Sequence, residues 1–245
     1  MVLATVLIAL LSACSRDAGP THVETRDVTE FHGIDIEGGS RLEISVGSPQ
    51  QVQVEAPQTV IDQIRTEVRD GILIVRSRGR HWVVGGTGSR ITLRISVPRL
   101  ESLRLTGGHR ANIDGYAGGE STIDVEGAVK LHASGQLDQL TVRLAGAGTA
   151  DLSELTATTA QVTVDGVGRV IVHSTETLDA TMNGLGAIHY IGTPREVRTR
   201  MNGLGSIGRQ DSAEEDAPVE LDPDKLQPEY DEREQWKKGG ETEVI

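Results

Sequence analysis

The chain has 245 residues, a net charge of −12 and only six aromatic side chains. This length suits one large domain or two small ones. The acidic balance excludes the electrostatic footprint of a nucleic-acid-binding protein, and so few aromatic residues argue against a platform for stacking single-stranded bases.

The first 14 residues, MVLATVLIALLSAC, are apolar up to Ala13 and end at the only cysteine of the chain. This run is too short to span a bilayer and has the length of a signal-peptide core, although no basic residue precedes it. Leu11-Ser12-Ala13-Cys14 resembles the lipobox of bacterial lipoproteins, in which the cysteine is lipidated and becomes the new N-terminus. We expect a signal peptide over residues 1–13, then a lipidated cysteine and polar tether over 14–30.

The lipobox resemblance also implies a location. Stable anchoring needs at least two lipid signals, which a multiply acylated Cys14, carrying fatty-acid chains such as palmitate, would provide. Ser15 stands where an aspartate would favour inner-membrane retention. The resemblance therefore implies a cell-envelope protein anchored to the outer membrane, on either its periplasmic or its surface face.

Residues 31–99 alternate apolar and polar side chains in short, irregular runs. Ile34 to Ile36, Leu42 to Val46 and Val52 to Val54 are expected to be strands separated by glycine-rich turns. Val60 to Ile64 could form a helical turn. Asp70-Gly71 predicts a hairpin between the strands on either side of it.

From residue 100 the chain repeats itself. MNGLGAI at 182–188 returns as MNGLGSI at 201–207, and weaker versions occur upstream. Aligning them on the first glycine of each phrase gives intervals of 18 to 20 residues between Gly107, Gly127, Gly146, Gly166, Gly184 and Gly203. A near-constant period is the sequence signature of a stacked repeat architecture.

Each repeat has the period-two pattern of a half-buried strand before its glycine, and none has a helical pattern. A single repeat cannot bury its apolar face, but stacked repeats can. We therefore predict an all-β fold over residues 31–207, a β-solenoid of the right-handed parallel β-helix type with coils of about 19 residues. It would comprise an irregular part (31–99) and regular repeats (100–207), with Asn183 and Asn202 stacked as a ladder. An antiparallel β-sandwich is the alternative.

The C-terminal segment differs in composition from the repeats. Residues 210–245 contain 13 acidic and four basic residues, several prolines and no apolar period. This composition is typical of disorder, and we expect an acidic disordered tail over 208–245.

The order of these motifs resembles that of a known family. FHGIDIEG, LEISVG, VQVEA, DGILIV and ITLRISVPRLESLRLTGG, followed by repeated Gly-x-Gly phrases, are similar to the head-GIN domain family of auto-transporter adhesin-like proteins. The resemblance covers residues 31 to about 207. It implies an all-β fold of stacked coils, carriage on bacterial lipoproteins and no known catalytic residues.

Candidate catalytic and metal-binding residues are scattered. Glu126 and Asp165 share a repeat position two coils apart, about 10 Å, with no supporting cluster of carboxylates. His132 and His189 share another position three coils apart, too far for one metal. We therefore predict no catalytic residue, no metal site and no cofactor.

Two basic features could bind a partner. Arg110, Lys130 and Arg169 share one repeat position, which Thr149 interrupts; a solvated charged face is the simpler explanation for them. The segment RSRGRHWVVGGTGSR combines arginines with a tryptophan, residue types that are enriched at interaction hot spots. Its candidate partner-binding residues are Arg76, Arg78, Arg80, His81, Trp82 and Arg90. A surface hairpin tip without a binding role is the alternative.

The sequence thus favours a non-enzymatic envelope lipoprotein that presents a rigid β-solenoid for adhesion or for interaction with an envelope protein or glycan. A carbohydrate-active β-helix enzyme acting on polysaccharide is the alternative. A homo-oligomer that pairs through open strand edges is a third hypothesis.

Overall fold

The computed structural model describes residues 21–77 and 91–210, which belong to one compact unit ending at Gln210. The unit is all-β, as the sequence predicts, and its strands form one mixed, open sheet of twelve strands. In chain order the elements are β1 (Thr21–Arg26), β2 (Gly33–Val46), β3 (Gln51–Pro57), α1 (Gln58–Ile61), β4 (Ile64–Arg69), β5 (Ile72–Ser77), β6 (Thr92–Val97), β7 (Ser102–Ala117), β8 (Glu120–Val164), β9 (Val167–Met182), β10 (Leu185–Ile191), β11 (Glu196–Met201) and β12 (Leu204–Arg209).

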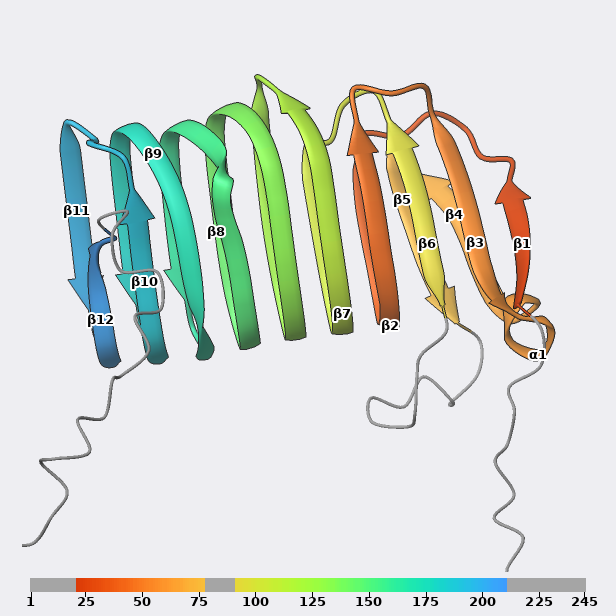
Figure 1. The fold of residues 1–245 in the computed structure, drawn as a ribbon. Helices are drawn as coiled ribbons and strands as arrows, with labels where there is room; N and C mark the ends of the chain where they lie inside the picture. The colour runs from red at the N-terminus through yellow and green to blue at the C-terminus, as the bar shows by residue number, and fades with distance from the viewer. Residues whose placement is uncertain (1–20, 78–90, 211–245) are drawn as a thin grey trace, which may run out of the picture. The chain divides into compact units, whose positions relative to one another are not determined.

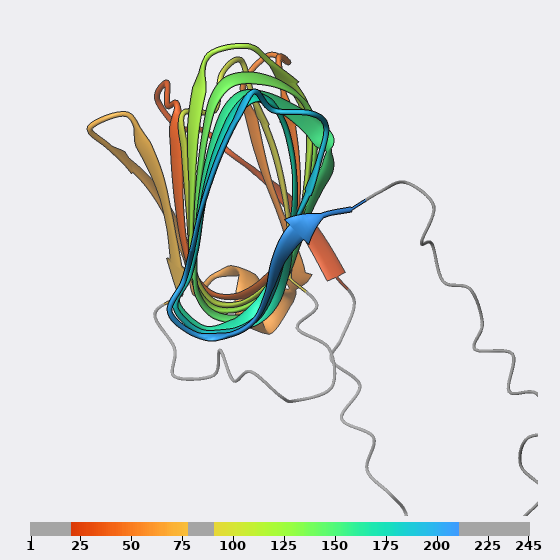
Figure 2. The same cartoon turned by 90° about the vertical axis from the view of Figure 1, so that its left-hand side faces the viewer.

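The two ends of the sheet pair their strands differently. In sheet order, neighbouring strands from β2 through β7, β8, β9 and β10 to β12 are parallel and in register over long stretches. At the other end, β3 is antiparallel to both of its neighbours, β1 and β6. Figure 1 shows the successive passes of the chain side by side, from β1 at one end to β11 and β12 at the other. Figure 2 looks along the row of passes, from the end at β11 and β12. In this view the passes overlie one another as nested ovals.

The aligned glycines lie one against the next. Gly107 pairs with Gly127 in the β7–β8 register. A Cβ built on Gly146 would overlap the carbonyl oxygen of Gly127, and the same holds for Gly166 on Gly146, Gly184 on Gly166 and Gly203 on Gly184. The backbones approach so closely at this corner that no side chain fits between them, which explains why glycine recurs.

Strand β2 extends this column upstream of the repeats that the sequence alignment identified. Gly38 pairs with Gly107 and Arg41 with Arg110, within a register that runs from Gly33 to Ser45. β2, which falls in the part expected to be irregular (31–99), is thus a regular pass of the stack. The phrases GGSRL and GGHRA carry the signal, and only the long excursion through β3 to β6 separates them.

The core consists of the side chains that alternate inward. Leu144, Val164 and Met182 are fully buried, and Val164 pairs with Met182 in the β8–β9 register. Met201 pairs with Met182 but is 41% exposed, because β11 is in the last described pass and has no further pass covering it. Burial of each such apolar side chain stabilises the stack by about 1.5–3 kcal/mol before entropy.

The turn predictions for the irregular part are confirmed. Strands β4 and β5 form an antiparallel hairpin, with Asp70 and Gly71 both at positive φ (50° and 73°) in its turn. Two consecutive left-handed residues are what a two-residue hairpin loop requires. The expected helical turn is present as the single turn α1, which buries Ile61.

Two expected boundaries differ in the structure. Residues 21–26, predicted as part of a polar tether, form β1, which is paired in register with β3. This strand is mostly exposed and has one apolar residue, Val23, so its sequence lacks the alternation that identifies a half-buried strand. At the other end β12 extends to Arg209, two residues past the expected end of the repeats.

Candidate binding edge

The corner at which each pass turns is the most distinctive surface of the molecule. We call it the glycine edge: Gly38, Gly107, Gly127, Gly146, Gly166, Gly184 and Gly203, each with the four residues that follow it. In each pass the first and third residues after the glycine are outward positions, while the fourth is turned toward the core. The in-register pairing stacks each of these positions into a straight line with steps of about 4.8 Å.

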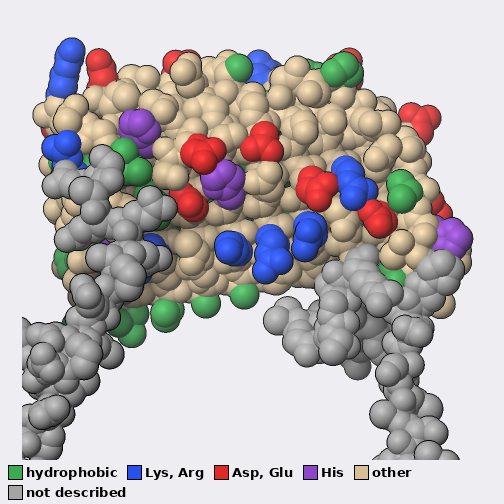
Figure 3. Space-filling view, viewed as in Figure 1, with side chains coloured by type: hydrophobic (Ala, Val, Ile, Leu, Met, Phe, Trp, Pro, Cys, Tyr) green, Lys and Arg blue, Asp and Glu red, His purple; other side chains and the backbone are tan. Residues whose placement is uncertain are grey.

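The third position forms a row of cations. Arg41 pairs with Arg110 and Arg110 with Lys130, and Thr149 pairs with Arg169. All four basic side chains are exposed, and none of them makes an ion pair or side-chain hydrogen bond with any residue in the described part of the chain. Figure 3 shows a line of basic side chains along this face. The sequence identified Arg110, Lys130 and Arg169 but not Arg41, which we include in the cation row.

A cation on the neighbouring strand β6, Arg94, is neutralised. Arg94 on β6 donates to Glu43 at 2.9 Å from Nε and to Glu55 at 2.7 Å from Nη1. The hydrogen bond to Glu55 is the main cause that raises the pKa of this guanidinium, and the charge of Glu43 acts in the same direction. Arg94 is therefore a cross-strand tie between β2 and β3, whereas the cation row lacks such partners.

The first position forms an apolar ridge next to the cation row. Val167 pairs with Leu185 and Leu185 with Leu204, and their side chains are 58%, 51% and 71% exposed. The preceding passes have the exposed Ala128 and Ala147 at this position. Figure 3 shows apolar side chains protruding below the line of basic ones. Sequence reasoning missed this ridge, although aligning the repeats on their glycines places its residues in one column.

A buried histidine lies beneath the cation row. His109 is 6% exposed; its Nδ1 is 3.1 Å from Ser40 Oγ and its Nε2 is 3.2 Å from the Thr106 carbonyl oxygen. Burial lowers the pKa of His109 below its usual 6.5, and the backbone hydrogen bond to Thr106 opposes this shift. Since Arg110 follows His109 directly, this buried side chain helps to fix the strand that carries the row.

The predicted partner-binding segment begins and ends at the glycine edge. Val75 pairs with Ile36, so Ser77 is level with Gly38, and Ile91 accepts a hydrogen bond from the Arg41 amide. Arg78, Arg80, His81, Trp82 and Arg90 lie outside the described residues.

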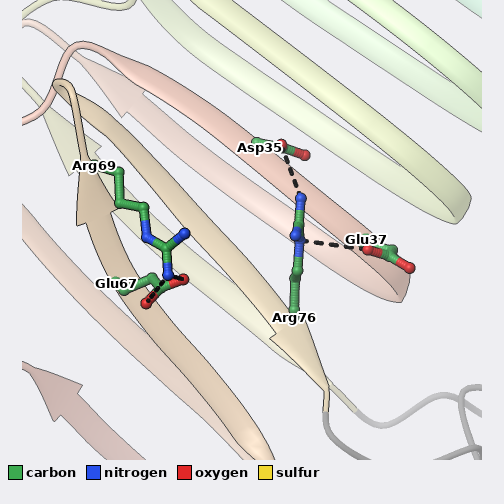
Figure 4. Close-up of polar contacts among 5 residues, drawn as sticks. All are labelled: Asp35, Glu37, Glu67, Arg69 and Arg76. Carbon is green, nitrogen blue, oxygen red and sulfur yellow. Dashed lines mark hydrogen bonds and ion pairs between the residues drawn. The ribbon is translucent and has the colours of Figure 1, made fainter.

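Arg76, the remaining member of that prediction, is within the described part and is engaged. Its Nη2 is 3.5 Å from Asp35 Oδ2 and its Nε is 3.4 Å from Glu37 Oε2 (Figure 4). The guanidinium lies between the two carboxylates of β2, while the neighbouring Arg69 pairs with Glu67 along β4. Arg76 therefore joins β5 to β2, and its charge is already shared with two carboxylates.

The acidic and histidine side chains do not converge. Asp124 faces Arg104 at 3.8 Å, Asp151 accepts from the Ser153 amide and hydroxyl, and His132 lies 3.6 Å from Glu154. Over residues 21–77 and 91–210 no three His, Cys, Asp or Glu side chains gather as a metal site would require. One open hollow of about 370 Å³, lined by residues 25–28 and 50–52, has the single carboxylate of Asp27.

A polar ladder stands just before the glycine corner. Asn202 donates to the Asn183 side-chain oxygen at 2.9 Å, and Asn183 donates to Asp165 at 2.6 Å. The predicted Asn183–Asn202 pair is confirmed, and Asp165 extends it by one pass. Asp165 is therefore a structural acceptor in this ladder.

Comparison with known proteins agrees with the motif order. The family model for "putative auto-transporter adhesin, head GIN domain" matches residues 30–194. The chain belongs to the head-GIN domain family. The match begins within a residue of the expected start and includes β2 to β10. No curated protein matches this head-GIN chain.

Solved structures share the fold at low identity. A crystal structure of a "putative adhesin" from Bacteroides fragilis is 20% identical, with a TM-score of 0.60 over 78% of this chain and 97% of that one. A "putative lipid binding protein" from Parabacteroides distasonis (18% identical, 79% and 98% covered) and a "putative adhesin" from Parabacteroides merdae (17%, 79% and 97%) each have a TM-score of 0.43. The first of these likenesses shows the fold of this head-GIN domain. None of its described helices is both long and apolar enough to cross a bilayer.

Proposed function

We propose that this head-GIN protein is a lipid-anchored β-solenoid of the bacterial cell envelope that works by adhesion, binding anionic partners through its glycine edge. The observation that carries the proposal is the cation row, whose four exposed charges have no partner in the described residues although the chain as a whole has a net charge of −12. Membership of an adhesin-like family supports a binding role.

The solenoid part of the proposal is supported by the register. Parallel pairing at intervals of 18 to 20 residues, with glycine on glycine, is what a coil repeating about a common axis produces. A right-handed path is the handedness of almost all parallel crossover connections. The antiparallel sandwich has less support, because antiparallel pairs are confined to β1, β3, β6 and the β4–β5 hairpin.

Lipid anchoring rests on the sequence. Cys14 lies outside the described residues, and its lipobox-like setting is the ground for proposing a signal peptide, multiple acylation and an outer-membrane location. β1 begins at Thr21, so a short segment joins the anchor to the folded unit. This arrangement would keep the solenoid close to the envelope surface.

The proposed mechanism is multivalent and involves no chemistry. Adjacent cations about 4.8 Å apart on a rigid sheet can contact a line of negative charges. Binding then has no entropy cost for ordering a loop. Each exposed contact is weak, about 1 kcal/mol or less, but several in line act together. The ends of the segment that carries Arg78, Arg80, His81, Trp82 and Arg90 adjoin this edge, so we include those residues in the proposed partner site.

A charge-matched comparison tests the row. We expect the full chain with Cys14→Ser to bind dextran sulfate, measured by fluorescence anisotropy, with an affinity that falls as salt screens the charges. The triple variant Arg110→Gln, Lys130→Gln, Arg169→Gln should lose at least about tenfold in affinity, since three contacts of several tenths of a kcal/mol are removed.

The control variant removes the same number of charges elsewhere. Arg104→Gln, Arg195→Gln and Arg198→Gln lie off the row and have acidic partners. We expect this triple variant to bind within about twofold of the parent, since its charges are already compensated. Equal losses in the two triple variants would show that net charge, and not the row, governs binding, and would refute the proposal.

A further inference from the structure

A soluble polyanion could pair with the cation row, but it has no apolar surface to cover the apolar ridge. Val167, Leu185 and Leu204 protrude from a convex corner, are half or more exposed, and increase in size from the alanines that precede them. Apolar side chains in an unbroken exposed line mark an interaction surface more often than isolated ones do. Sulfated or phosphorylated glycans would neutralise the cation row but would leave this ridge in water.

The cation row and the apolar ridge point outward from the same corner. Their positions are two residues apart along each pass, about 6–7 Å. The two sets overlap in the pass of Val167 and Arg169, and the passes of Leu185 and Leu204 have Ala187 and Ser206 at the third position. A lipid bilayer offers phosphate groups at its surface and acyl chains a few ångströms deeper. A straight convex edge with cations along one part and large apolar side chains along the next, the two meeting at Val167 and Arg169, offers contacts to both of these layers.

The N-terminus of the folded unit emerges on the same edge. Arg41 pairs with Thr92, Thr92 with Glu55 and Glu55 with Val23, so the start of β1 lies level with the glycine edge. Thr21 is two residues nearer the corner. Cys14 precedes Thr21 by seven residues, which span at most about 24 Å when extended. An acyl anchor at Cys14 would therefore hold this edge, and not the opposite one, toward the membrane.

We propose that the glycine edge docks on an anionic phospholipid surface, with Val167, Leu185 and Leu204 inserted among the headgroups and the cation row on the lipid phosphates. The inference rests on the proposed function, because it names the anionic partner of the same site. Each row cation adds about fivefold to the partition coefficient of the chain, and each ridge leucine adds a comparable factor through the apolar area it removes from water.

The test uses the mature chain, residues 14–245 with Cys14→Ser, which lacks the expected apolar signal peptide and cannot be acylated, in co-sedimentation with lipid vesicles. We expect binding to phosphatidylcholine vesicles that contain phosphatidylglycerol and little binding to phosphatidylcholine alone. Leu185→Ser with Leu204→Ser should lower the partition coefficient at least about tenfold and leave dextran sulfate affinity unchanged. The control Ile72→Ser removes an exposed apolar side chain at the end of β5 away from the glycine edge and should bind as the parent does.

A second readout does not depend on affinity. An environment-sensitive dye on Leu185→Cys, in the Cys14→Ser background, should shift to the blue on adding anionic vesicles, whereas the same dye on Ile72→Cys should not. Urea unfolding of each variant establishes that these exposed substitutions leave the fold intact.

The possible failures are distinguishable. Dextran sulfate binding through the row, with no vesicle binding or with ridge variants that bind vesicles like the parent, overturns the membrane inference and leaves the proposed function standing. Row variants that bind both probes like the parent refute both. Vesicle binding that appears only after residues 211–245 are removed would indicate that the cation row binds the chain's own acidic segment in the intact protein. That result would also overturn the inference.

Discussion

At the scale of single residues, His109 is a titratable side chain buried directly beneath the cation row. It occupies the second position after Gly107, where Gly148, Gly168, Gly186 and Gly205 stand in later passes. The neutral ring satisfies both hydrogen bonds if Nε2 donates to the Thr106 carbonyl and Nδ1 accepts from the Ser40 hydroxyl. A proton on Nδ1 would remove that acceptor inside a buried corner, so the neutral form is favoured.

This burial predicts a pH dependence of stability. Because the folded pKa of His109 is lowered from 6.5, the unfolded chain takes up a proton below that pH more readily than the folded chain does. The stabilisation is present in full above about pH 6.5 and is lost as the pH falls through 6.5 toward the folded pKa. Urea unfolding between pH 7.5 and 5.5 should show a loss in the parent that is absent from His109→Gln. A parallel decline in both proteins would assign the loss to other groups.

At the scale of elements, the glycine column determines how closely the strands stack. A Cβ at Gly166 would overlap the Gly146 carbonyl oxygen, which belongs to a hydrogen-bonded backbone and cannot move aside. We expect Gly166→Ala to lower the free energy of unfolding by about 1–3 kcal/mol, the cost typical of overpacking, measured by urea denaturation.

The matched control for this substitution is Gly208→Ala in β12, where a Cβ would meet nothing within 4 Å. Its effect should stay within about 0.5 kcal/mol, as for other surface substitutions. A loss for Gly166→Ala no larger than for Gly208→Ala would mean that the close glycine stacking is absent in solution.

The elements also show what sequence patterns can and cannot predict. Alternation and the repeated phrase were enough for the strands from residue 100 onward, for the Asp70-Gly71 hairpin and for the glycine alignment, because each is encoded locally. β1 was missed because its partner, β3, is about 30 residues away and its own residues are mostly polar. Arg41 was missed in the cation row because β2 is separated from its β7 partner by the β3–β6 excursion.

At the scale of the whole molecule, the positive charge of the glycine edge contrasts with the negative net charge of the chain. Residues 210–245 contain a net charge of −9, which leaves −3 for all preceding residues. Within that nearly balanced unit most described arginines pair with carboxylates, as Arg94, Arg104 and Arg200 do, and the cation row does not. This contrast could be read only in part from the sequence, because pairing depends on which strands become neighbours.

The central claim is that consecutive passes stack in register along one axis, since the cation row and the apolar ridge exist only if they do. Spin labels on cysteine pairs in the Cys14→Ser background test it by pulsed electron resonance. Positions 41, 169, 187 and 206 share one line of the glycine edge. From Arg41→Cys, we expect separations of about 19, 24 and 29 Å to labels at Arg169→Cys, Ala187→Cys and Ser206→Cys, one strand spacing per pass. Separations that do not increase by about one spacing from each position to the next would contradict the stacked arrangement.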